Sequence, residues 1–388
     1  MHRCLELARL GAGHTASNPM VGAVLVHEGR IIGEGYHQLY GQAHAEVNCL
    51  AAVKEEDISL IRHSTLYVSL EPCAHYGKTP PCADLIIRHK VPRVVVGCRD
   101  PFPEVDGKGL EKLQAAGVEV EVGVLEKECI TLNRRFFTFH ARRRPYILLK
   151  WAQSANLKIA AGKDGAASQG GPAGSSHAAV DAGSTVSTAN ANPDRTGGGS
   201  RIFISNEYSN RLVHKWRSEE AAILVGTNTA LSDDPALTVR LWKGPQPIRL
   251  VLDKELRLPR SLKVFDGQVR TIVFNTVKEE EADNLLYYRL NKGDNVVPQI
   301  LKALYEFRIL SVLVEGGTRL LQSFIDEGVW DEARVITNNE LEIPDGLAAP
   351  VLKNALAPSR ETLLTDTIRT YNNPLSIQVA GGYIPASR

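Results

Sequence analysis

Apolar and polar positions along the first 125 residues alternate in a way that predicts short strands and helices in turn. Residues 20–36 hold two β-branched apolar runs on either side of Glu28-Gly29, which predicts a β-hairpin. Beyond it the pattern predicts helices at 44–54 and 80–90 and strands at 64–73 and 93–101. Residues 107–124 are predicted to form a helix followed by a strand. This alternation is typical of a layered α/β domain.

A second α/β run begins near Pro145. The pattern predicts a strand at 146–154 and then a strand, a helix and a strand within 201–231. Three short apolar strands are predicted at 248–253, 271–275 and 309–317. Residues 318–336 are predicted to form a helix and the start of a further strand. Residues 162–200 interrupt this run and contain no Leu, Ile, Phe, Tyr, Trp or Met. Such a segment cannot bury enough apolar surface to fold alone, so we expect a flexible insertion there.

Composition limits the classes of protein that fit. A chain of 388 residues with 43% hydrophobic and 23% charged residues predicts a soluble protein of two domains. A net charge of +1 argues against nucleic-acid binding, and we read Arg142-Arg143-Arg144 as a solvated segment between domains. No apolar stretch is long enough for a membrane span, and residues 1–13 lack the pattern of a secretory signal. Six dispersed cysteines favour a reducing compartment, so we expect the cytoplasm.

Four residues form the most specific chemical pattern in the chain. His44 and Glu46 stand at the start of a predicted helix, Cys73 follows a predicted strand, and Cys82 opens the next helix. One imidazole and two thiolates are good zinc ligands, and three protein ligands leave the fourth position to water, as in catalytic sites. Zinc lowers the pKa of that water to about 7, and Glu46 could pass its proton to a leaving amine.

The order His-x-Glu, Pro-Cys, Cys matches the signature of zinc nucleobase deaminases, except that eight residues instead of two separate Cys73 from Cys82. Singly, a His-x-Glu is more often a surface helix start, and a lone cysteine is more often a core residue. Together these motifs are far more specific. A structural zinc site is an alternative, but it requires Cys49 or His75 as a fourth ligand.

Longer stretches carry a resemblance to a known family. The segments NPMVGAVLV, GEGYHQLYGQAHAEVNCL, YVSLEPCAHYGKTPPCADLI and RDPFPEVDGKGLEKLQAAGVEV resemble the deaminase half of the bifunctional riboflavin-biosynthesis deaminase/reductase family. The resemblance implies a three-layer, cytidine-deaminase-like domain over residues 1–143. It also implies His44, Cys73 and Cys82 as zinc ligands and Glu46 as the proton shuttle. The residues that it assigns to the pyrimidine and its ribose phosphate are Asn18, His37, His75 and Lys78.

The remaining half offers a second set of motifs, ILVGTNTALSDDPALTVR and VLVEGGTRLLQSF. Arg217 and Arg240 could clamp a phosphate, and Gly316-Gly317 lets a pyrophosphate approach a helix start. There is no Gly-x-Gly-x-x-Gly fingerprint, so a standard Rossmann site is not supported. The motifs are similar to the family's reductase domain, an α/β domain like dihydrofolate reductase, over residues 144–388.

This second resemblance implies two groups of contacts. The residues that it assigns to the substrate are Arg217, Leu237, Arg240 and Glu315. The residues that it assigns to NADPH are Gln153, Phe203, Thr229, Asp233, Gly317, Thr318, Arg319, Leu320, Leu321, Gln322 and Ser323. Asn156-Leu157 departs from the family's usual Asp-Gly, and Phe203 stands where many members have tryptophan.

The resemblance implies that the protein catalyses two consecutive reactions. The first step is zinc-hydroxide deamination of 2,5-diamino-6-(5-phosphoribosylamino)pyrimidin-4-one. The second is NADPH-dependent reduction of the ribosyl group of 5-amino-6-(5-phosphoribosylamino)uracil to ribityl. One alternative keeps the deaminase with a C-terminal binding module that does not reduce. Another, a nucleic-acid deaminase, is disfavoured by the neutral charge. The expected partners are these small phosphorylated pyrimidines and other copies of the chain, without nucleic acid or membrane.

Overall fold

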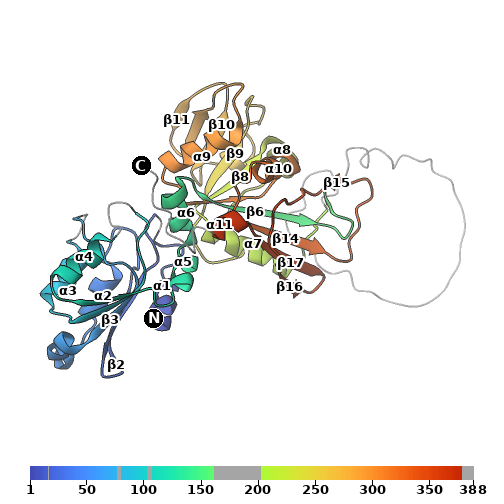
Figure 1. Ribbon diagram of the computed structural model, residues 1–388. Coiled ribbons are helices and arrows are strands. Elements are labelled where there is room, and N and C mark those ends of the chain that lie inside the picture. Colours follow the sequence, from blue (N-terminus) through green and yellow to red (C-terminus); the bar gives the residue numbers. More distant parts are fainter. Residues whose placement is uncertain (16, 77–79, 103–106, 161–201, 378–388) are drawn as a thin grey trace, which may run out of the picture.

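The computed structural model describes residues 1–388 except 16, 77–79, 103–106, 161–201 and 378–388, and it forms two α/β units, each built on its own sheet (Figure 1). The predicted insertion at 162–200 lies outside the described residues. Among the described residues, none of the helices combines the length and the apolar character that crossing a bilayer requires.

The first unit has a five-stranded sheet in the order β2-β1-β3-β4-β5. Its strands are β1 (Gly22–His27), β2 (Arg30–Tyr36), β3 (Thr65–Leu70), β4 (Arg93–Cys98) and β5 (Glu119–Val122). Its helices are α1 (His2–Arg9), α2 (Ala45–Ala51), the 3₁₀ helix η1 (Glu55–His63), α3 (Cys82–Arg88), α4 (Lys108–Ala115) and α5 (Glu126–Leu132). Strand β1 is antiparallel to β2 and β3, whereas β3, β4 and β5 are parallel.

Alternation along β1 shows how this sheet separates two helical layers. Ala23 and Leu25 are buried in one core with residues of α2, α3 and α4, and Val24 is buried in another core with α1. Side chains on a strand point to opposite faces in turn, so one strand supplies both cores. The three-layer fold expected of this half is confirmed, as are the hairpin and the predicted helices and strands.

The second unit has a ten-stranded sheet in the order β11-β12-β10-β9-β8-β13-β6-β14-β17-β16. Its strands are β6 (Tyr146–Gln153), β8 (Ala222–Gly226), β9 (Ile248–Leu252), β10 (Thr271–Asn275), β11 (Glu280–Ala282), β12 (Leu285–Arg289), β13 (Ser311–Val314), β14 (Glu332–Asn338), β16 (Ser359–Leu363) and β17 (Asp366–Asn372). A separate two-stranded sheet joins β7 (Lys158–Ala160) to β15 (Leu347–Ala348). The seven strands from β12 to β14 are parallel, and β11, β17 and β16 are antiparallel to their neighbours.

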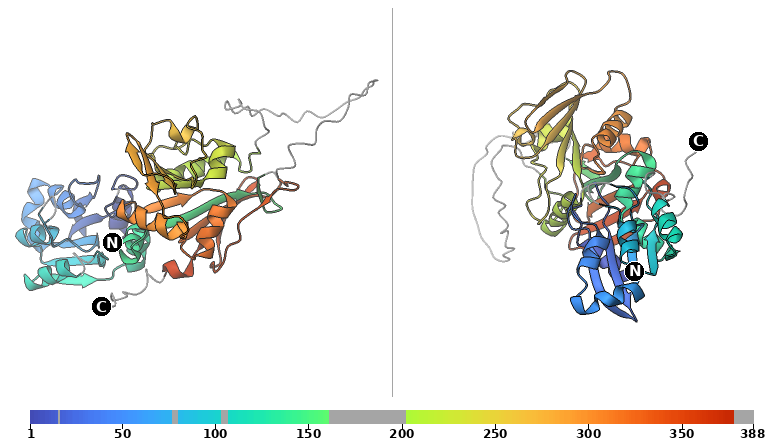
Figure 2. Two further views of the ribbon diagram at one scale, coloured as in Figure 1. Left: turned by 90° about the horizontal axis from the view of Figure 1, so that it is seen from above. Right: turned by 90° about the vertical axis from the view of Figure 1, so that its left-hand side faces the viewer.

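Helices cover both faces of the large sheet (Figure 2). They are α6 (Arg134–Arg142), α7 (Glu207–Glu219), α8 (Thr227–Asp233), the 3₁₀ helix η3 (Lys263–Phe265), α9 (Val296–Glu306), α10 (Thr318–Asp326) and α11 (Pro374–Ile377). Ile147 and Leu149 of β6 share a core with α9 and α10, whereas Leu148 shares one with α8 and η3. The parallel, doubly covered sheet confirms the predicted α/β class.

Three predictions for this half were incomplete or wrong. Residues 202–205 were predicted as part of a strand, but they form irregular backbone. The predicted strand at the end of 201–231 stops at Gly226, and residues 227–233 form the short helix α8, which the sequence pattern did not predict. Arg144 was assigned to a solvated segment, yet it is buried and pairs with Asp331 at 2.6 Å.

Helix α6 lies between the two units and carries charges that the second unit neutralises. Arg134 pairs with Glu332 at 2.8 Å, and Arg135 forms a two-pronged ion pair with Glu220. The Glu220 and Glu332 side chains are 0% and 2% exposed, so both carboxylates are removed from water. These buried pairs attach the end of the first unit to the amino ends of the second sheet.

Candidate active sites

The start of helix α2 places His44 and Glu46 side by side. His44 is the N-cap residue in extended backbone, and Glu46 lies in the first turn and is 3% exposed. The helix sits directly on strand β2, because Gly35 has no side chain: a Cβ there would lie 2.2 Å from the backbone nitrogen of Cys49. This close approach fixes the distance of the His44 and Glu46 side chains from the sheet.

Two loops bring the cysteines to His44. Cys73 follows β3, and Cys82 is the first residue of α3. The Nδ1 atom of His44 lies 3.6 Å from the Cys73 Sγ and 3.3 Å from the Cys82 Sγ. Zn–S and Zn–N bonds of about 2.3 and 2.1 Å at tetrahedral angles require a nitrogen-to-sulfur separation of about 3.6 Å. The three residues therefore fit one zinc ion, with their ligand atoms all within 4.8 Å of one another.

The electrostatics of the cluster suit a metal and a proton carrier. A hydrogen bond from the Cys82 thiol lowers the pKa of Cys73 to about 4 despite burial, and it raises the pKa of Cys82 itself. The two sulfurs thus share a proton at neutral pH, and a cation can take its place because thiolates are the ligating form. Burial raises the pKa of Glu46 to about 7. A carboxyl group in that range can both accept and release a proton.

Two of the predicted substrate residues meet beside the cluster. Asn18 Nδ2 lies 3.1 Å from His37 Nε2, and His37 Nδ1 lies 3.0 Å from the carbonyl oxygen of Ala43. The His37 and His44 rings are in edge contact, with centroids 5.6 Å apart. His75 is exposed, and its ring centroid lies 6.4 Å from that of Phe102. Lys78 lies outside the described residues.

Glu71 was not among the predicted site residues, but the structure gives it a supporting role. Its buried carboxylate accepts hydrogen bonds from the backbone N–H groups of Asp100, Gly107 and Gly109, at 3.3, 3.1 and 3.0 Å. Glu71 stands two residues before Cys73, so it ties the cysteine loop to the start of α4. The Glu71-Pro72 dipeptide at a strand end was the available signal.

Replacing Cys73 with serine is expected to lower the zinc content from about one atom per chain to near zero, because a hydroxyl is a poor substitute for a thiolate. Metal analysis of the purified protein measures this. Cys49→Ala is the matched control: Cys49 is buried but lies outside the three-residue cluster found among the described residues. Zinc loss in the control would instead support a structural site with Cys49 as a ligand.

The second site lies at the carboxyl ends of β8 and β13, which are neighbours in the sheet. Helix α8 follows β8 directly, and the Gly316-Gly317 turn follows β13. A Cβ at Gly316 would lie 3.1 Å from the Thr229 side chain, and Gly317 has φ +48°. The turn therefore has to be glycine-rich for α8 and α10 to begin side by side.

The predicted cofactor residues divide into two sets in the structure. Leu320 and Leu321 are 7% and 1% exposed and belong to the core, so they can contact a ligand only through the backbone. Gly317 is the N-cap of α10, and the N–H groups of its first turn have no intrahelical acceptors. The remaining polar or exposed members are Thr318, Arg319, Gln322 and Ser323 from α10 and Thr229 and Asp233 from α8. Gln153 is buried and bonds Trp151 and Thr337, and Phe203 is 61% exposed.

Two predicted substrate residues bind each other. The Arg217 guanidinium donates to both oxygens of Glu315, at 2.8 and 2.6 Å, and to the Thr238 carbonyl. Burial acts to raise the pKa of Glu315, but Arg217 and then Lys150 lower it to about 2, so it is ionised. Lys150, which sequence reasoning missed, is a lysine on β6, and burial lowers its pKa. Arg240 is exposed, with its guanidinium 3.3 Å from Thr238 Oγ1.

The departure at Asn156-Leu157 is accommodated by the fold. Asn156 donates to the Ile343 carbonyl and accepts from the Ile343 N–H, at 3.1 and 3.2 Å. Leu157 has φ +59°, in the left-handed region that glycine occupies without strain. Leu157 therefore adopts the left-handed conformation that suits the glycine usual in the family, and its side chain makes this conformation sterically less favourable.

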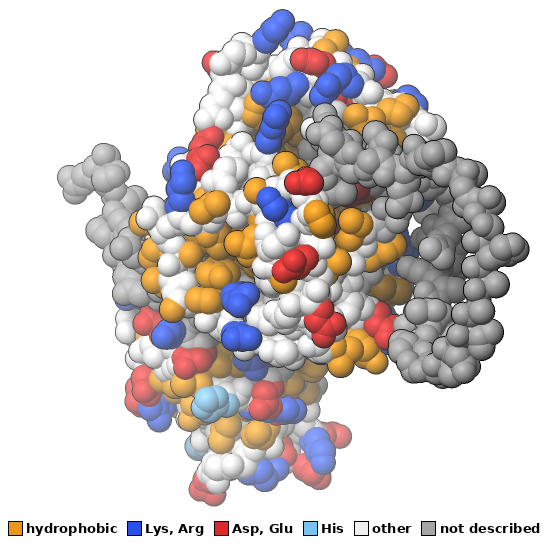
Figure 3. All heavy atoms as spheres, turned by 90° about the vertical axis from the view of Figure 1, so that its right-hand side faces the viewer, with side chains coloured by type: hydrophobic (Ala, Val, Ile, Leu, Met, Phe, Trp, Pro, Cys, Tyr) orange, Lys and Arg blue, Asp and Glu red, His pale blue; other side chains and the backbone are white. Residues whose placement is uncertain are grey.

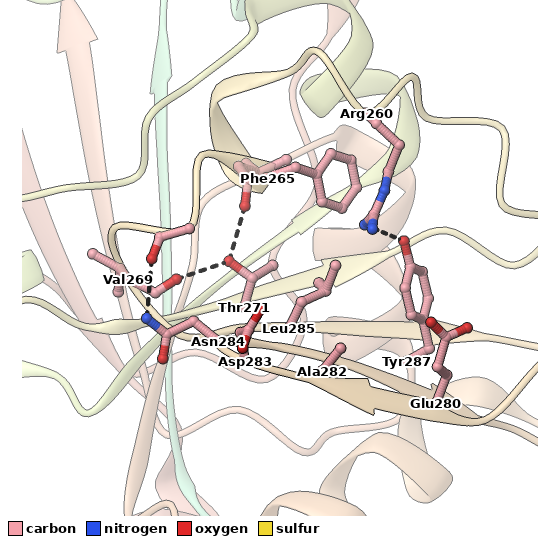
Figure 4. A pocket seen from close by; sticks show the side chains of 12 residues that line it. Arg260, Phe265, Val269, Thr271, Glu280, Ala282, Asp283, Asn284, Leu285 and Tyr287 are labelled. Carbon is pink, nitrogen blue, oxygen red and sulfur yellow. Dashed lines mark hydrogen bonds between the residues drawn. The ribbon is translucent and has the colours of Figure 1, made fainter.

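A surface pocket of about 210 Å³ lies elsewhere, near the amino ends of β10 and β12 (Figure 4). Arg260 and Tyr287 bond each other across it, and Thr271 donates to the carbonyl oxygens of Val264 and Val269. Both candidate sites lie at other places in the fold, so this pocket is separate from the chemistry described above.

Comparison with known proteins places these two sites in context. Residues 1–98 match the family described as the cytidine and deoxycytidylate deaminase zinc-binding region, and residues 145–338 match the RibD C-terminal domain. The chain is 42% identical to the riboflavin biosynthesis protein RibD of Aquifex aeolicus, over 85% of this chain and 83% of that protein. It is 33% identical to the RibD of Escherichia coli, over 86% of this chain and 84% of that protein.

A solved structure agrees in fold. It is the diaminohydroxyphosphoribosylaminopyrimidine deaminase/5-amino-6-(5-phosphoribosylamino)uracil reductase of Thermotoga maritima. The two chains are 33% identical, with a TM-score of 0.78 over 96% of this chain and 97% of that one. The likeness extends over both units, so it covers both candidate sites.

Proposed function

The chain belongs to the family of bifunctional riboflavin biosynthesis proteins RibD, and from this membership we propose how its residues divide the two reactions. The protein is a zinc-dependent deaminase and an NADPH-dependent reductase. The relatives match along both units, so the alternative of a deaminase with a non-reducing module is set aside. The observation that carries the residue assignment is the convergence of His44, Cys73 and Cys82 beside buried Glu46.

We assign the first step to this cluster. Zinc held by His44, Cys73 and Cys82 supplies, when bound, a water that loses its proton at neutral pH. The Glu46 carboxylate takes this proton and returns it to the departing amino group, so that ammonia leaves and the ring carbon gains oxygen. Asn18 and His37 orient the pyrimidine through their polar atoms, with His37 fixed by the Ala43 carbonyl. The substrate is the diaminopyrimidinone ribosylamino phosphate.

We assign the second step to the strand-end site. Backbone N–H groups of the first turn of α10, reached past Gly317, hold the pyrophosphate of NADPH. The Thr229 side chain of α8 adjoins that turn, and Asp233 ends the same helix. NADPH supplies the hydride when bound. Arg240 holds the substrate phosphate, and ionised Glu315, kept in place by Arg217, accepts hydrogen bonds from the sugar hydroxyls.

The same proposal extends to the organisation of the chain. We place the deaminase domain at residues 1–143 and the reductase domain at 144–388, supported by the separate sheets and by the matched ranges. We propose a cytoplasmic homo-oligomer acting on small phosphorylated pyrimidines. All six cysteines are free thiols, which suits a reducing compartment. On the face in Figure 3, basic and acidic side chains are interspersed, which suits small substrates better than a nucleic-acid backbone.

A two-part assay tests the function. With the diaminopyrimidinone substrate, the zinc-loaded protein is expected to release ammonia; with the deaminated product, it is expected to oxidise NADPH. Zinc removal by a chelator is expected to stop ammonia release and to leave NADPH oxidation intact, because the zinc ligands and the reductase site belong to different units. A folded protein that leaves NADPH unchanged with the deaminated substrate would contradict the reductase assignment.

A further inference from the structure

Residues 237–240 lie between helix α8 and strand β9 and include two of the predicted substrate contacts, Leu237 and Arg240. This segment has no helical or strand hydrogen bonding of its own. Leu237 is nevertheless 2% exposed, with φ +52°, a backbone conformation that side-chain-bearing residues rarely adopt. A segment of this kind keeps one conformation only if surrounding groups hold it.

Gln246 holds the middle of this segment. Its Oε1 accepts from the N–H of Val239 at 2.7 Å, and its Nε2 donates to the carbonyl oxygen of the same residue at 3.0 Å. One amide side chain thus satisfies both backbone groups of Val239, in the way that a neighbouring strand would.

His214 holds the end of the segment. It is 2% exposed on α7, and its Nδ1 lies 3.1 Å from the backbone N–H of Arg240, from which it accepts a hydrogen bond. Burial, together with Arg217 and Arg240, lowers the pKa of His214 to about 4, so the ring is neutral and its lone pair is available. Arg217 completes the set by donating to the Thr238 carbonyl at 3.3 Å.

We propose that Gln246 and His214 are positioning residues of the reductase, which fix the backbone of residues 238–240 so that Arg240 meets the substrate phosphate. This inference rests on the proposed substrate site. Neither residue touches the substrate; each acts through the backbone of the segment, which three side chains hold at Thr238, Val239 and Arg240. Loss of either side chain lets the segment sample other conformations, and substrate binding then has to order it again.

The test measures steady-state NADPH oxidation by the full-length protein with the deaminated pyrimidine substrate. Gln246→Ala is expected to raise the KM for this substrate about tenfold, which corresponds to the loss of about one net hydrogen bond in binding. The kcat and the KM for NADPH are expected to stay within about twofold, because none of the residues assigned to NADPH belongs to the 238–240 segment. Ammonia release by the deaminase is expected to be unchanged.

Gln299 provides a matched control. Its side chain makes the same two bonds to the backbone of Asn291, accepting at 2.7 Å and donating at 3.4 Å, between β12 and α9. Gln299→Ala therefore removes an equivalent clamp away from the site, and the KM is expected to stay at the wild-type value. A rise equal to that of Gln246→Ala would overturn the proposal, because it would show a general loss of stability.

A pair of His214 variants separates positioning from packing. His214→Leu removes the acceptor and is expected to raise the KM about tenfold. His214→Asn keeps an oxygen near the Nδ1 position and is expected to restore most of the binding. Arg240→Ala tests the underlying site. If Arg240→Ala raises the KM but Gln246→Ala and His214→Leu do not, the clamp is wrong and the substrate site stands; if Arg240→Ala has no effect, the site assignment fails first and the clamp with it.

Discussion

Glu46→Gln is expected to lower the kcat of ammonia release by at least about 10²-fold while zinc remains bound. Glutamine has nearly the shape of glutamate but cannot take a proton from water or return it to the departing amine. His44, Cys73 and Cys82 are unchanged in this variant, so the metal site is expected to survive. Glu46 is buried and interacts with Cys73, His44 and Cys82, which places its carboxylate beside the cluster.

Three measurements on the same preparation make this result decisive: ammonia release, zinc content and NADPH oxidation with the deaminated substrate. Zinc content and NADPH oxidation are expected to match the wild type. Glu34→Gln is the control within the same unit, because Glu34 pairs with Arg3 on the surface of the sheet. Wild-type ammonia release by a zinc-loaded Glu46→Gln protein would favour a structural role for the metal.

Local sequence patterns were sufficient to predict the hairpin and the zinc ligands of the first unit. The Glu28-Gly29 turn occupies two consecutive left-handed positions, which close the hairpin that was predicted there. The zinc ligands were identifiable because His44 and Cys82 flank helix starts and Cys73 follows a strand end, so short motifs mark all three positions. Their meeting in space follows from the pairing of β1, which is antiparallel to both β2 and β3, so that the carboxyl ends of β2 and β3 lie at the same edge of the sheet.

Contacts between distant segments left no such pattern. Arg144 and Asp331 are 187 residues apart, so a basic run was read as solvated when one of its members is buried. Helix α8 was missed because its Thr, Asn, Ser and Asp residues have weak helix propensity, and the packing of Ala230 stabilises it instead. The clamp on residues 238–240 depends on a histidine and a glutamine from different elements, which no spacing relates.

Arg135→Met is expected to lower the stability of the protein by about 3–5 kcal/mol, because it leaves the Glu220 carboxylate buried without its partner. The Glu220 side chain is 0% exposed. Burial acts to raise its pKa, and Arg135 holds it below its ordinary value, so the carboxylate depends on the arginine to remain charged. Urea unfolding of the full-length chain, followed by circular dichroism, measures the change as a lower midpoint of the transition.

The double variant Arg135→Met/Glu220→Leu decides whether the cost comes from the stranded charge. Removing both partners is expected to recover most of the lost stability, since a well-packed apolar pair can replace a buried ion pair at little cost. Arg270→Met is the surface control: its pair with Glu281 has side chains 44% and 56% exposed, and no measurable change in midpoint is expected. If the double variant is as unstable as Arg135→Met, the arginine stabilises the junction between the two units through its packing against Tyr146, and the ion pair itself contributes little.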